Sequence, residues 1–286
     1  MNGVTIGEIN RLSTPRHDSH KGQNGRLLVI GGSHLFHAAS LWALTVASRI
    51  VDLVHYSSVP ENNEIVQQVK EEFRNGIVVS RADLDAYIEE DDCILIGVGM
   101  TRDRETESLT NSVLNKYPHK RWVIDAGALQ MMDLSLMPPN AILTPHHGEF
   151  AIIWEKAVAS HAEFARAQTD EDKIKLFVCT YHCIVLLKGE EDLACQVKPG
   201  SVLQDNVDCR EIAGGNAGMT KGGTGDVLSG LIAALACKND PFLATIAGSF
   251  INKMAGDALY KTVGPYFNST DLANQIPVTM KELLLS

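Results

Sequence analysis

The sequence predicts an α/β fold with a mostly parallel central sheet flanked by helices. Short apolar runs recur along the chain, and each is followed at once by glycine, aspartate or proline and then by a polar or helical stretch. The runs do not alternate between apolar and polar residues, which is typical of strands buried on both faces of a parallel sheet. Helical patterns separate the runs, and strands that alternate with helices indicate the α/β class.

The strand candidates precede a mostly helical C-terminal part. In chain order they are RLLVIGGS (26–33), VDLVHYSS (51–58), NGIVVS (75–80), CILIGVGM (93–100), RWVIDAGAL (121–129), AILTPHHGE (141–149) and CIVLLKGE (183–190). We expect helices near 39–50, 61–73, 104–117 and 160–178, and mostly helix from Asp226 onward. No linker rich in Pro, Gly and Ser divides the chain and no repeat is evident, so we expect a single domain over 1–286.

Composition limits the classes of partner. Apolar residues make up 45% of the chain, enough to fill a sizeable core. The formal charge of −10 and the absence of a Lys/Arg run argue against a nucleic-acid partner, since phosphate backbones require clustered cations. A local site of amides and one lysine can still bind a small anion. The N-terminus lacks the features of a signal peptide and no apolar run approaches the ~20 residues that span a bilayer, so we expect a cytoplasmic protein without a membrane partner.

The cysteines and histidines predict no metal site. The six cysteines form no CxxC pair, so we expect reduced thiols, several of them buried. They are Cys93, Cys179, Cys183, Cys195, Cys209 and Cys237. Histidines are paired at 17 and 20, at 34 and 37 and at 146 and 147, but none belongs to an H-E-x-x-H pattern.

The stretch GNAGMTKGGTGDVLSG, over 215–230, predicts an anion-binding site with a base beside it. Gly222, Gly223 and Gly225 permit backbone angles that other residues avoid, so successive N–H groups can point into one hollow. The start of the following helix adds its amides and dipole. A carboxylate repels phosphate, so we interpret Asp226 as a general base that takes a proton from an attacking hydroxyl. The alternative is that Asp226 only caps the helix.

This stretch is neither a Walker loop nor a G-x-G-x-x-G after a strand. It resembles the signature of ribokinase-like proteins and, among them, of the NAD(P)H-hydrate dehydratases. Further motifs occur in that family's order and spacing along nearly the whole chain, namely KGQNGRLLVIGGS (21–33), GVGM (97–100), IDAGAL (124–129), LTPHHGEF (143–150) and LLKG (186–189). The resemblance implies a ribokinase-like three-layer sandwich.

The resemblance also implies an enzyme that repairs damaged nicotinamide cofactor. Family members of this type convert the 6S hydrate of NADH or NADPH back to the normal cofactor, with ADP in bacterial and archaeal forms and ATP in eukaryotic ones. The implied products are AMP and phosphate. Hydroxide is a poor leaving group, so the ring hydroxyl would be phosphorylated and phosphate then expelled by the lone pair of the ring nitrogen. Mg²⁺ is expected to arrive with the nucleotide and to need few protein ligands.

Residue roles follow from the matching motif positions. The resemblance implies that Asp226 deprotonates the hydrate, a contribution typically worth ~10² to 10⁴ in rate. The other residues implied at the hydrate are Ala39 in HAAS, Gly99 in GVGM and His146 in TPHHGE. The residues implied at the nucleotide and the transferred phosphoryl group are Lys188, Gly189, Gly222, Gly223, Thr224 and Gly225.

Individual residues also have purely structural interpretations. Lys188 could be a solvated lysine in an ordinary turn. His146 and His147 could serve only to start a helix. Glu149 could stabilise the same helix start through its dipole, and we assign it no catalysis.

Two positions depart from the usual family pattern. Gly127 in DAGAL stands where many members have an aspartate, so either that carboxylate is dispensable or the hydrate pocket differs. Ala38 stands in place of the first glycine of a YxGA stretch, and its methyl group could narrow a close backbone approach. Ala39 is retained.

The family also implies partners. Members are often fused to an N-terminal epimerase domain that interconverts the hydrate epimers. The motifs of this chain begin by Lys21, so we expect a separate NAD(P)H-hydrate epimerase in the same pathway. Relatives are commonly symmetric oligomers, which implies a homo-oligomer.

Two other functions remain open. A ribokinase-like kinase of a vitamin precursor, of the hydroxymethylpyrimidine or hydroxyethylthiazole type, shares the GGTGD pattern and would release a stable phosphorylated product. A catalytically silent nucleotide binder would lack the base or the lysine, whereas Asp226 and Lys188 are both present.

Overall fold

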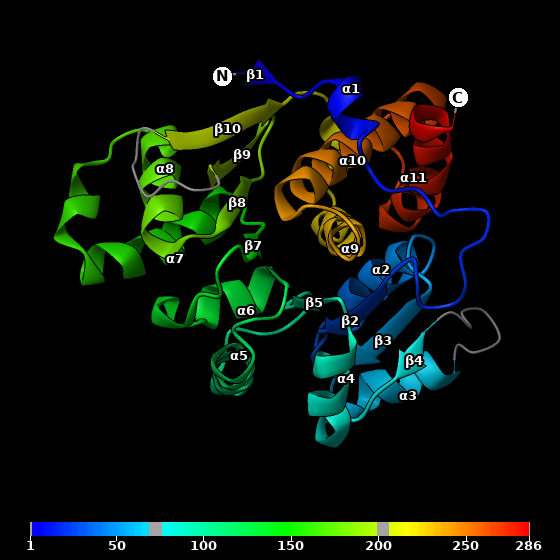
Figure 1. The fold of residues 1–286 in the computed structure, drawn as a ribbon, viewed down its shortest axis with the longest axis horizontal. Helices are drawn as coiled ribbons and strands as arrows, with labels where there is room; N and C mark the ends of the chain where they lie inside the picture. The colour runs from blue at the N-terminus through cyan, green and yellow to red at the C-terminus, as the bar shows by residue number, and fades with distance from the viewer. Residues whose placement is uncertain (1, 69–75, 199–205, 286) are drawn as a thin grey trace.

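A computed structural model describes residues 2–68, 76–198 and 206–285 (Figure 1). Within these ranges the chain forms one ten-stranded sheet of order β1-β10-β9-β8-β7-β6-β5-β2-β3-β4. Only the β8–β9 and β9–β10 pairs of this sheet are antiparallel. The prediction of a mostly parallel sheet is therefore confirmed.

Every strand predicted from an apolar run is present. The strands are β1 (Asn2–Gly3), β2 (Arg26–Ile30), β3 (Leu53–Ser57), β4 (Ile77–Val78), β5 (Cys93–Ile96), β6 (Trp122–Ile124), β7 (Ile142–Leu143), β8 (Ile184–Leu187), β9 (Asp192–Val197) and β10 (Val207–Ile212). The sequence analysis does not predict β1, β9 or β10, which form one edge of the sheet. Asn75, the first residue of the 75–80 run, lies outside the described residues.

Helices connect the strands and fill the C-terminal part. They are α1 (Ile6–Ile9), α2 (Ala38–Ala47), α3 (Pro60–Gln68), α4 (Leu84–Glu90), α5 (Arg104–Lys116), α6 (Ala126–Met131), α7 (His147–Ser160), α8 (Asp170–Tyr181), α9 (Thr224–Ala236), α10 (Pro241–Val263) and α11 (Ser269–Leu284). Positions 69–73 of the helix expected near 61–73 lie outside the described residues. Among the helices described, none combines the length and the apolar character needed to cross a bilayer.

The helix predicted over 160–178 is wrong in its limits. The chain instead forms α7, which ends at Ser160, and α8, which begins at Asp170. A 3₁₀ turn over 162–166 separates them and buries Phe164. Thr169 starts α8 anew, because its side chain accepts a hydrogen bond from the Asp172 N–H at 3.1 Å. This N-cap signal divides an apolar pattern that otherwise looks continuous.

The buried strands separate two apolar cores, which makes the fold three-layered. In β5, Cys93 and Leu95 pack into the core under α2, α9, α10 and α11, whereas Ile94 and Ile96 pack into the core under α4 to α8. Alternate residues of a strand point to opposite faces, so both faces must be covered by helices. Figure 1 shows α10 and α11, from the end of the chain, near α2 from its beginning.

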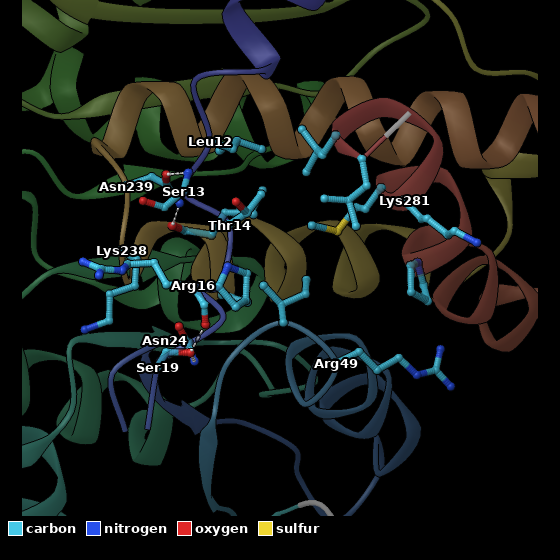
Figure 2. Close-up of a pocket in the computed structure, with 18 of the residues that line it drawn as sticks. Leu12, Ser13, Thr14, Arg16, Ser19, Asn24, Arg49, Lys238, Asn239 and Lys281 are labelled. Atoms are coloured by element: carbon cyan, nitrogen blue, oxygen red, sulfur yellow. Dashed lines mark hydrogen bonds between the residues drawn. The ribbon is translucent and has the colours of Figure 1, made fainter. Parts of the chain in front are cut away.

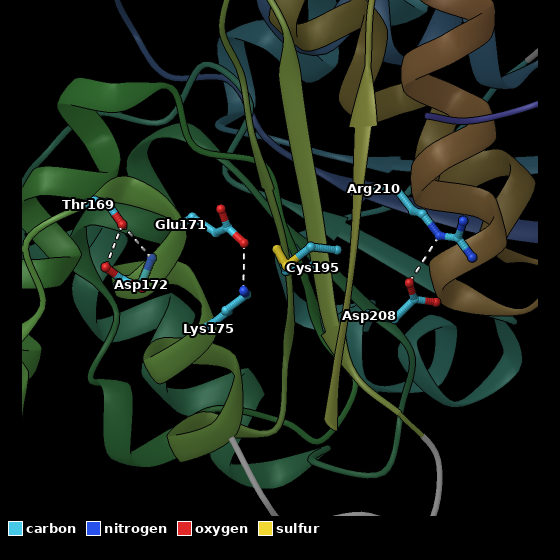
Figure 3. Close-up of a disulfide and its surroundings, with 8 residues drawn as sticks. Thr169, Glu171, Asp172, Lys175, Cys195, Asp208 and Arg210 are labelled. Atoms are coloured by element: carbon cyan, nitrogen blue, oxygen red, sulfur yellow. Dashed lines mark hydrogen bonds and ion pairs between the residues drawn. A yellow bond between two sulfur atoms is a disulfide. The ribbon is translucent and has the colours of Figure 1, made fainter. Parts of the chain in front are cut away.

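The expectation that all six cysteines are reduced is wrong for one pair. A disulfide joins Cys195 of β9 to Cys209 of β10, with the two Cα atoms 4.2 Å apart (Figure 3). The antiparallel register places these residues directly opposite each other, which accounts for the bond. The four other cysteines are free thiols, and Cys93, Cys183 and Cys237 among them are buried.

Removal of this disulfide is expected to lower stability. The bond spans 14 positions of the chain. In the chain-entropy account, a cross-link over a loop of this length stabilises the folded state by ~3 kcal/mol because it restricts the unfolded chain. Urea unfolding of the double variant Cys195→Ser/Cys209→Ser, compared with the unreduced wild type, measures the difference. Reductant should destabilise the wild type and leave the variant unchanged, and equal unfolding midpoints would argue against a stabilising bond.

Candidate active site

Polar side chains that follow parallel strands meet at one edge of the sheet. Lys188 follows β8, Asp125 follows β6, and Glu149 lies in the first turn of α7, which follows β7. The Lys188 Nζ lies 3.3 Å from Asp125 Oδ1 and 3.8 Å from Glu149 Oε2. Ligand sites of open α/β sheets lie at the carboxyl ends of the strands, so the position fits a ligand site.

In this cluster of Lys188, Asp125 and Glu149, the two carboxylates are buried and the lysine is partly buried. The Lys188 side chain is 18% exposed, against 3% for Asp125 and 7% for Glu149. Burial alone would lower the pKa of Lys188, but the Asp125 and Glu149 carboxylates outweigh it and raise that pKa. Burial, helped by Asp125, raises the pKa of Glu149. Lys188 is therefore an ion-paired lysine inside the site and not a solvated lysine in a turn.

The glycine-rich turn leads directly into α9. Gly223 is the N-cap residue, with φ of 95°, a backbone angle that favours glycine. The Thr224 hydroxyl donates to the carbonyls of Met219 at 2.7 Å and Lys221 at 3.0 Å, and these bonds fix the turn. Asp226 is the third residue of α9. Asp226 therefore lies in the first turn of α9 and is not its N-cap residue.

The Asp226 carboxyl titrates near neutral pH. Burial and the neighbouring Asp125 carboxylate raise the pKa of Asp226 from 3.8 to about 7, against the opposing effect of Lys188. A general base is most effective when its pKa lies near the working pH. The environment of Asp226 thus suits a group that accepts and then releases a proton.

Two cavities open on the turn around 222–226. The first, the Lys188 cavity, has a volume of about 520 Å³, and the second, the Asp226 cavity, about 990 Å³. The two share no lining residue. Thr224 and Gly225 line the first, whereas Gly222, Gly223 and Asp226 line the second. The turn therefore separates two sites that are each large enough for a small ligand.

The sequence-predicted residues divide between these cavities. The hydrate residues Ala39, Gly99, His146 and Asp226 all line the Asp226 cavity. The nucleotide residues Lys188, Gly189, Thr224 and Gly225 line the Lys188 cavity. The remaining predicted phosphoryl residues, Gly222 and Gly223, line the Asp226 cavity. All of the predicted residues are thus gathered at one place in the fold.

His146 has a structural role and also lines the Asp226 cavity. Its Nδ1 accepts hydrogen bonds from the N–H groups of Gly148 at 3.0 Å and Glu149 at 3.2 Å, so it is the N-cap of α7. Glu149 accepts a hydrogen bond from the His146 N–H at 2.9 Å and completes a capping box. This arrangement fixes the ring at the cavity wall. His147 is exposed, and its Nδ1 lies 3.2 Å from Asp170 Oδ2.

The departure at Gly127 has a steric explanation. A Cβ added at Gly127 would lie 2.2 Å from the Met100 carbonyl oxygen, so the backbone occupies the space of a side chain there. An aspartate at this position would require the loop after β5 to move. Gly127 and Ala38 both line the Asp226 cavity.

We expect Gly223→Ala to be far more damaging than Gly222→Ala. At Gly223, φ is +95° and a Cβ would lie 2.2 Å from Trp42 Cζ3, whereas nothing lies within 4 Å of a Cβ at Gly222. The strained backbone alone costs of order 1–3 kcal/mol. Thermal unfolding of both variants measures the difference, and similar melting temperatures would contradict the strain argument.

Sequence reasoning missed Asp125 and its partner Ser229. The Ser229 hydroxyl donates to Asp125 Oδ2 and lies 2.9 Å from the Gly225 carbonyl oxygen. Asp125 is thereby connected to the turn of α9 as well as to Lys188. The aspartate lies inside the IDAGAL motif, directly after a buried strand, which is the signal that could have identified it.

Lys253 is a second missed residue, and it shapes the Lys188 cavity. It is buried, and its Nζ donates to the carbonyls of Glu190 at 2.9 Å and Gly214 at 3.1 Å. Its Nζ also lies 3.3 Å from Asp192 Oδ1. Asp192 accepts a hydrogen bond from the Gly189 N–H at 2.9 Å. Lys253 therefore joins the turn after β8 to the segment after β10 across this cavity.

A third cavity, of about 660 Å³, lies at the opposite end of α9 (Figure 2). It is bounded by the N-terminal segment around Ser13 and by the C-terminal ends of α2, α9 and α11. Two of its four cations already serve the fold, because Arg49 donates to the Ala273 carbonyl at 2.6 Å and Lys238 lies 3.1 Å from Asp92 Oδ2. None of the predicted site residues lines it.

Solved structures share this architecture. A ribokinase-like superfamily protein of Enterococcus faecalis matches with a TM-score of 0.83 at 22% identity, over 100% of this chain and 97% of that one. The ADP/ATP-dependent NAD(P)H-hydrate dehydratase of Bacillus subtilis, co-crystallized with ATP/Mg²⁺, matches with a TM-score of 0.76 at 23% identity, over 99% and 98% of the two chains. The fold is therefore a ribokinase-like three-layer sandwich.

Sequence comparison then narrows the class. The NAD(P)H-hydrate dehydratase family profile matches residues 27–278. An ADP-dependent (S)-NAD(P)H-hydrate dehydratase of Nitrosopumilus maritimus is 34% identical over 92% of this chain and 91% of its own. A bifunctional NAD(P)H-hydrate repair enzyme of Methanocaldococcus jannaschii is 35% identical over 97% of this chain, which spans only 52% of that relative. The chain belongs to the NAD(P)H-hydrate dehydratase family.

Proposed function

We propose that this protein catalyses the ADP-dependent dehydration of the 6S hydrate of NADH or NADPH. The products are NADH or NADPH, AMP and phosphate. The proposal is supported by the family and by the relative of Nitrosopumilus maritimus, whose name specifies ADP and the S hydrate. We assign the whole described chain to one catalytic domain.

The observation that carries the proposal is that Asp226 lines one of two cavities that meet at the turn around 222–226. Phosphoryl transfer requires a donor and an acceptor to meet in line, with a base at the acceptor hydroxyl. The Lys188 cavity suits the donor, because Lys188 lines it together with Thr224 and Gly225, the first two residues of α9. The Asp226 cavity suits the hydrate, because the carboxyl with a pKa of about 7 faces it.

The reaction follows from these positions. Asp226 takes the proton of the ring hydroxyl, whose oxygen then attacks the terminal phosphoryl group of ADP, and the bond to AMP breaks. The amides of 222–225 stabilise the charge on the transferred group. The phosphorylated hydrate then loses phosphate as the ring nitrogen donates its lone pair, which leaves an iminium ion. Loss of a proton from the adjacent ring carbon to the released phosphate then restores the ring double bond and returns the lone pair to nitrogen. The oxygen of the hydroxyl leaves within the phosphate, so no free water is released.

Mg²⁺ fits this site as an ion carried by the nucleotide. Over residues 2–68, 76–198 and 206–285, no group of three or more His, Cys, Asp or Glu side chains is placed to hold a metal. Asp125 and Glu149 already pair with Lys188. Mg²⁺ usually keeps several waters and binds to substrate phosphates with one or two carboxylates. Among the described residues, Glu190 and Asp192 are the carboxylates that line the Lys188 cavity. When bound, the ion would neutralise charge on the phosphates.

We also assign the supply of the S epimer to an NAD(P)H-hydrate epimerase activity. Support comes from the bifunctional repair enzymes among the relatives, of which this chain matches about half.

The direct test is to mix the purified protein and Mg²⁺ with hydrated NADH and to add ADP or ATP in parallel. Restored NADH absorbs in the near ultraviolet, so we expect an absorbance rise that depends on the nucleotide and is faster with ADP. Absence of any rise with either nucleotide would contradict the proposal. A stable phosphorylated product from a hydroxymethylpyrimidine or hydroxyethylthiazole would then favour the vitamin-precursor kinase.

A further inference from the structure

The Asp226 cavity has an unfavourable charge balance for a dinucleotide. Its wall includes Asp226 and Glu149; Glu149 already has an ion-pair partner in Lys188, at 3.8 Å, whereas Asp226 has none among the described residues. Any dinucleotide brings a pyrophosphate with two negative charges, and NADPH carries a further phosphate on the adenosine ribose. Charges of one sign in a shared cavity repel each other unless a cation compensates them. The cavity therefore requires a positive group for this class of ligand.

Arg102 is the cation that fits this requirement. Among the described residues that line the Asp226 cavity, it is the sole lysine or arginine. Lys188 lines the other cavity and is already paired with Asp125 and Glu149. Arg102 comes from the loop after β5, the same loop that brings Gly99 to the cavity wall.

The local structure leaves the Arg102 guanidinium available. Its side chain makes no hydrogen bond or ion pair with any residue in the described ranges 2–68, 76–198 and 206–285. The adjacent Asp103 is occupied elsewhere, because it accepts a hydrogen bond from the Thr101 hydroxyl and another from the Thr106 N–H at 2.9 Å. Asp103 thereby caps α5 and does not neutralise its neighbour.

We propose that Arg102 binds a phosphate group of the dinucleotide substrate at the mouth of the Asp226 cavity. The inference rests on the proposed function. A guanidinium can form two parallel hydrogen bonds to phosphate, which gives both charge and geometry. The phosphate is that of the pyrophosphate or the ribose 2′-phosphate, and the two have the same chemistry toward an arginine.

Equilibrium binding of NADH and NADPH, the products of the reaction, tests this inference without turnover. Fluorescence titration of Arg102→Ala should show affinity at least about tenfold weaker than wild type, as expected for a lost charged contact. Arg102→Lys should recover part of the loss, since it keeps the charge without the planar geometry. The matched control is Arg104→Ala, which removes an exposed arginine two positions away that does not line the cavity.

The outcomes separate the possibilities. Equal weakening for NADH and NADPH assigns Arg102 to the pyrophosphate, and weakening confined to NADPH assigns it to the ribose phosphate. Unchanged affinity of Arg102→Ala for both ligands, or an equal loss in Arg104→Ala, would overturn the inference and leave the proposed function intact. A wild-type protein that binds neither dinucleotide would contradict the proposed function, and the inference with it.

Discussion

Replacement of Asp226 by asparagine is expected to lower kcat by at least ~10² while ADP binding is retained, because the variant keeps the shape of the side chain and loses the base. Single-turnover kinetics with the hydrate and a separate ADP titration measure the two effects. In the wild type, kcat/KM should rise with pH through about 7, since the base must be deprotonated. Unchanged turnover in the variant would remove Asp226 from the mechanism.

The same variant has a stability signature that a merely inactive protein would lack. The folded-state pKa of Asp226 lies above its ordinary value of 3.8, so the native protein holds this proton more tightly than the unfolded chain does. Wild-type stability therefore falls as pH rises between 3.8 and about 7. Asparagine does not ionise, so Asp226→Asn does not lose this stability. The variant should melt at a higher temperature than wild type above pH 7, and the difference in melting temperature should shrink in acid.

Replacement of Lys188 by methionine is expected to destabilise the fold by ~3–5 kcal/mol, because it leaves two buried carboxylates without their cation. Both partners are almost fully buried, at 3% exposure for Asp125 and 7% for Glu149. The variant should also bind ADP more weakly, and its deficit should shrink at high salt as screening grows. Urea unfolding and ADP titration over a range of salt concentrations measure these effects.

Lys173→Met provides the matched control for this lysine. Its Nζ lies 3.7 Å from Asp170 Oδ1 in a pair that is 28% and 48% exposed. Exposed pairs contribute ~0–1 kcal/mol, so this variant should stay close to wild type. The double variant Lys188→Met/Asp125→Asn removes one of the stranded charges and should recover part of the stability. If Lys188→Met were as stable as wild type and bound ADP as tightly, Lys188 would have neither a stabilising nor a nucleotide-binding role.

The parallel half of the fold could be predicted because its strands are buried on both faces. The sequences of such strands are continuous apolar runs, which can be recognised without a structure. β9 and β10, with the sequences DLACQV and VDCREI, lie toward the sheet edge and are partly exposed, so polar residues interrupt the apolar signal. The disulfide was missed for the same reason, since it depends on the register of a hairpin that the pattern did not reveal.

In the candidate site, too, residues close together in the sequence could be predicted, whereas contacts between distant residues could not. Asp226 and its glycines stand within a few residues of one another, so their combined chemistry can be read from the chain. Asp125 gains its role from Lys188, 63 positions away, and from Ser229, 104 positions away. Such contacts arise only when parallel strands bring their ends together. The capping box formed by His146 and Glu149 could be predicted as a helix start, because the two residues are three positions apart. The position of this helix start at a cavity wall could not be predicted.

The separate linings of the two cavities have a kinetic consequence. Because no residue belongs to both, a molecule that fills one compartment does not displace an occupant of the other. With the ligands placed as proposed, donor and acceptor are expected to enter in either order and to form a ternary complex before any bond changes. A nonreactive adenine nucleotide should consequently compete with ADP alone, and a dinucleotide should compete with the hydrate alone.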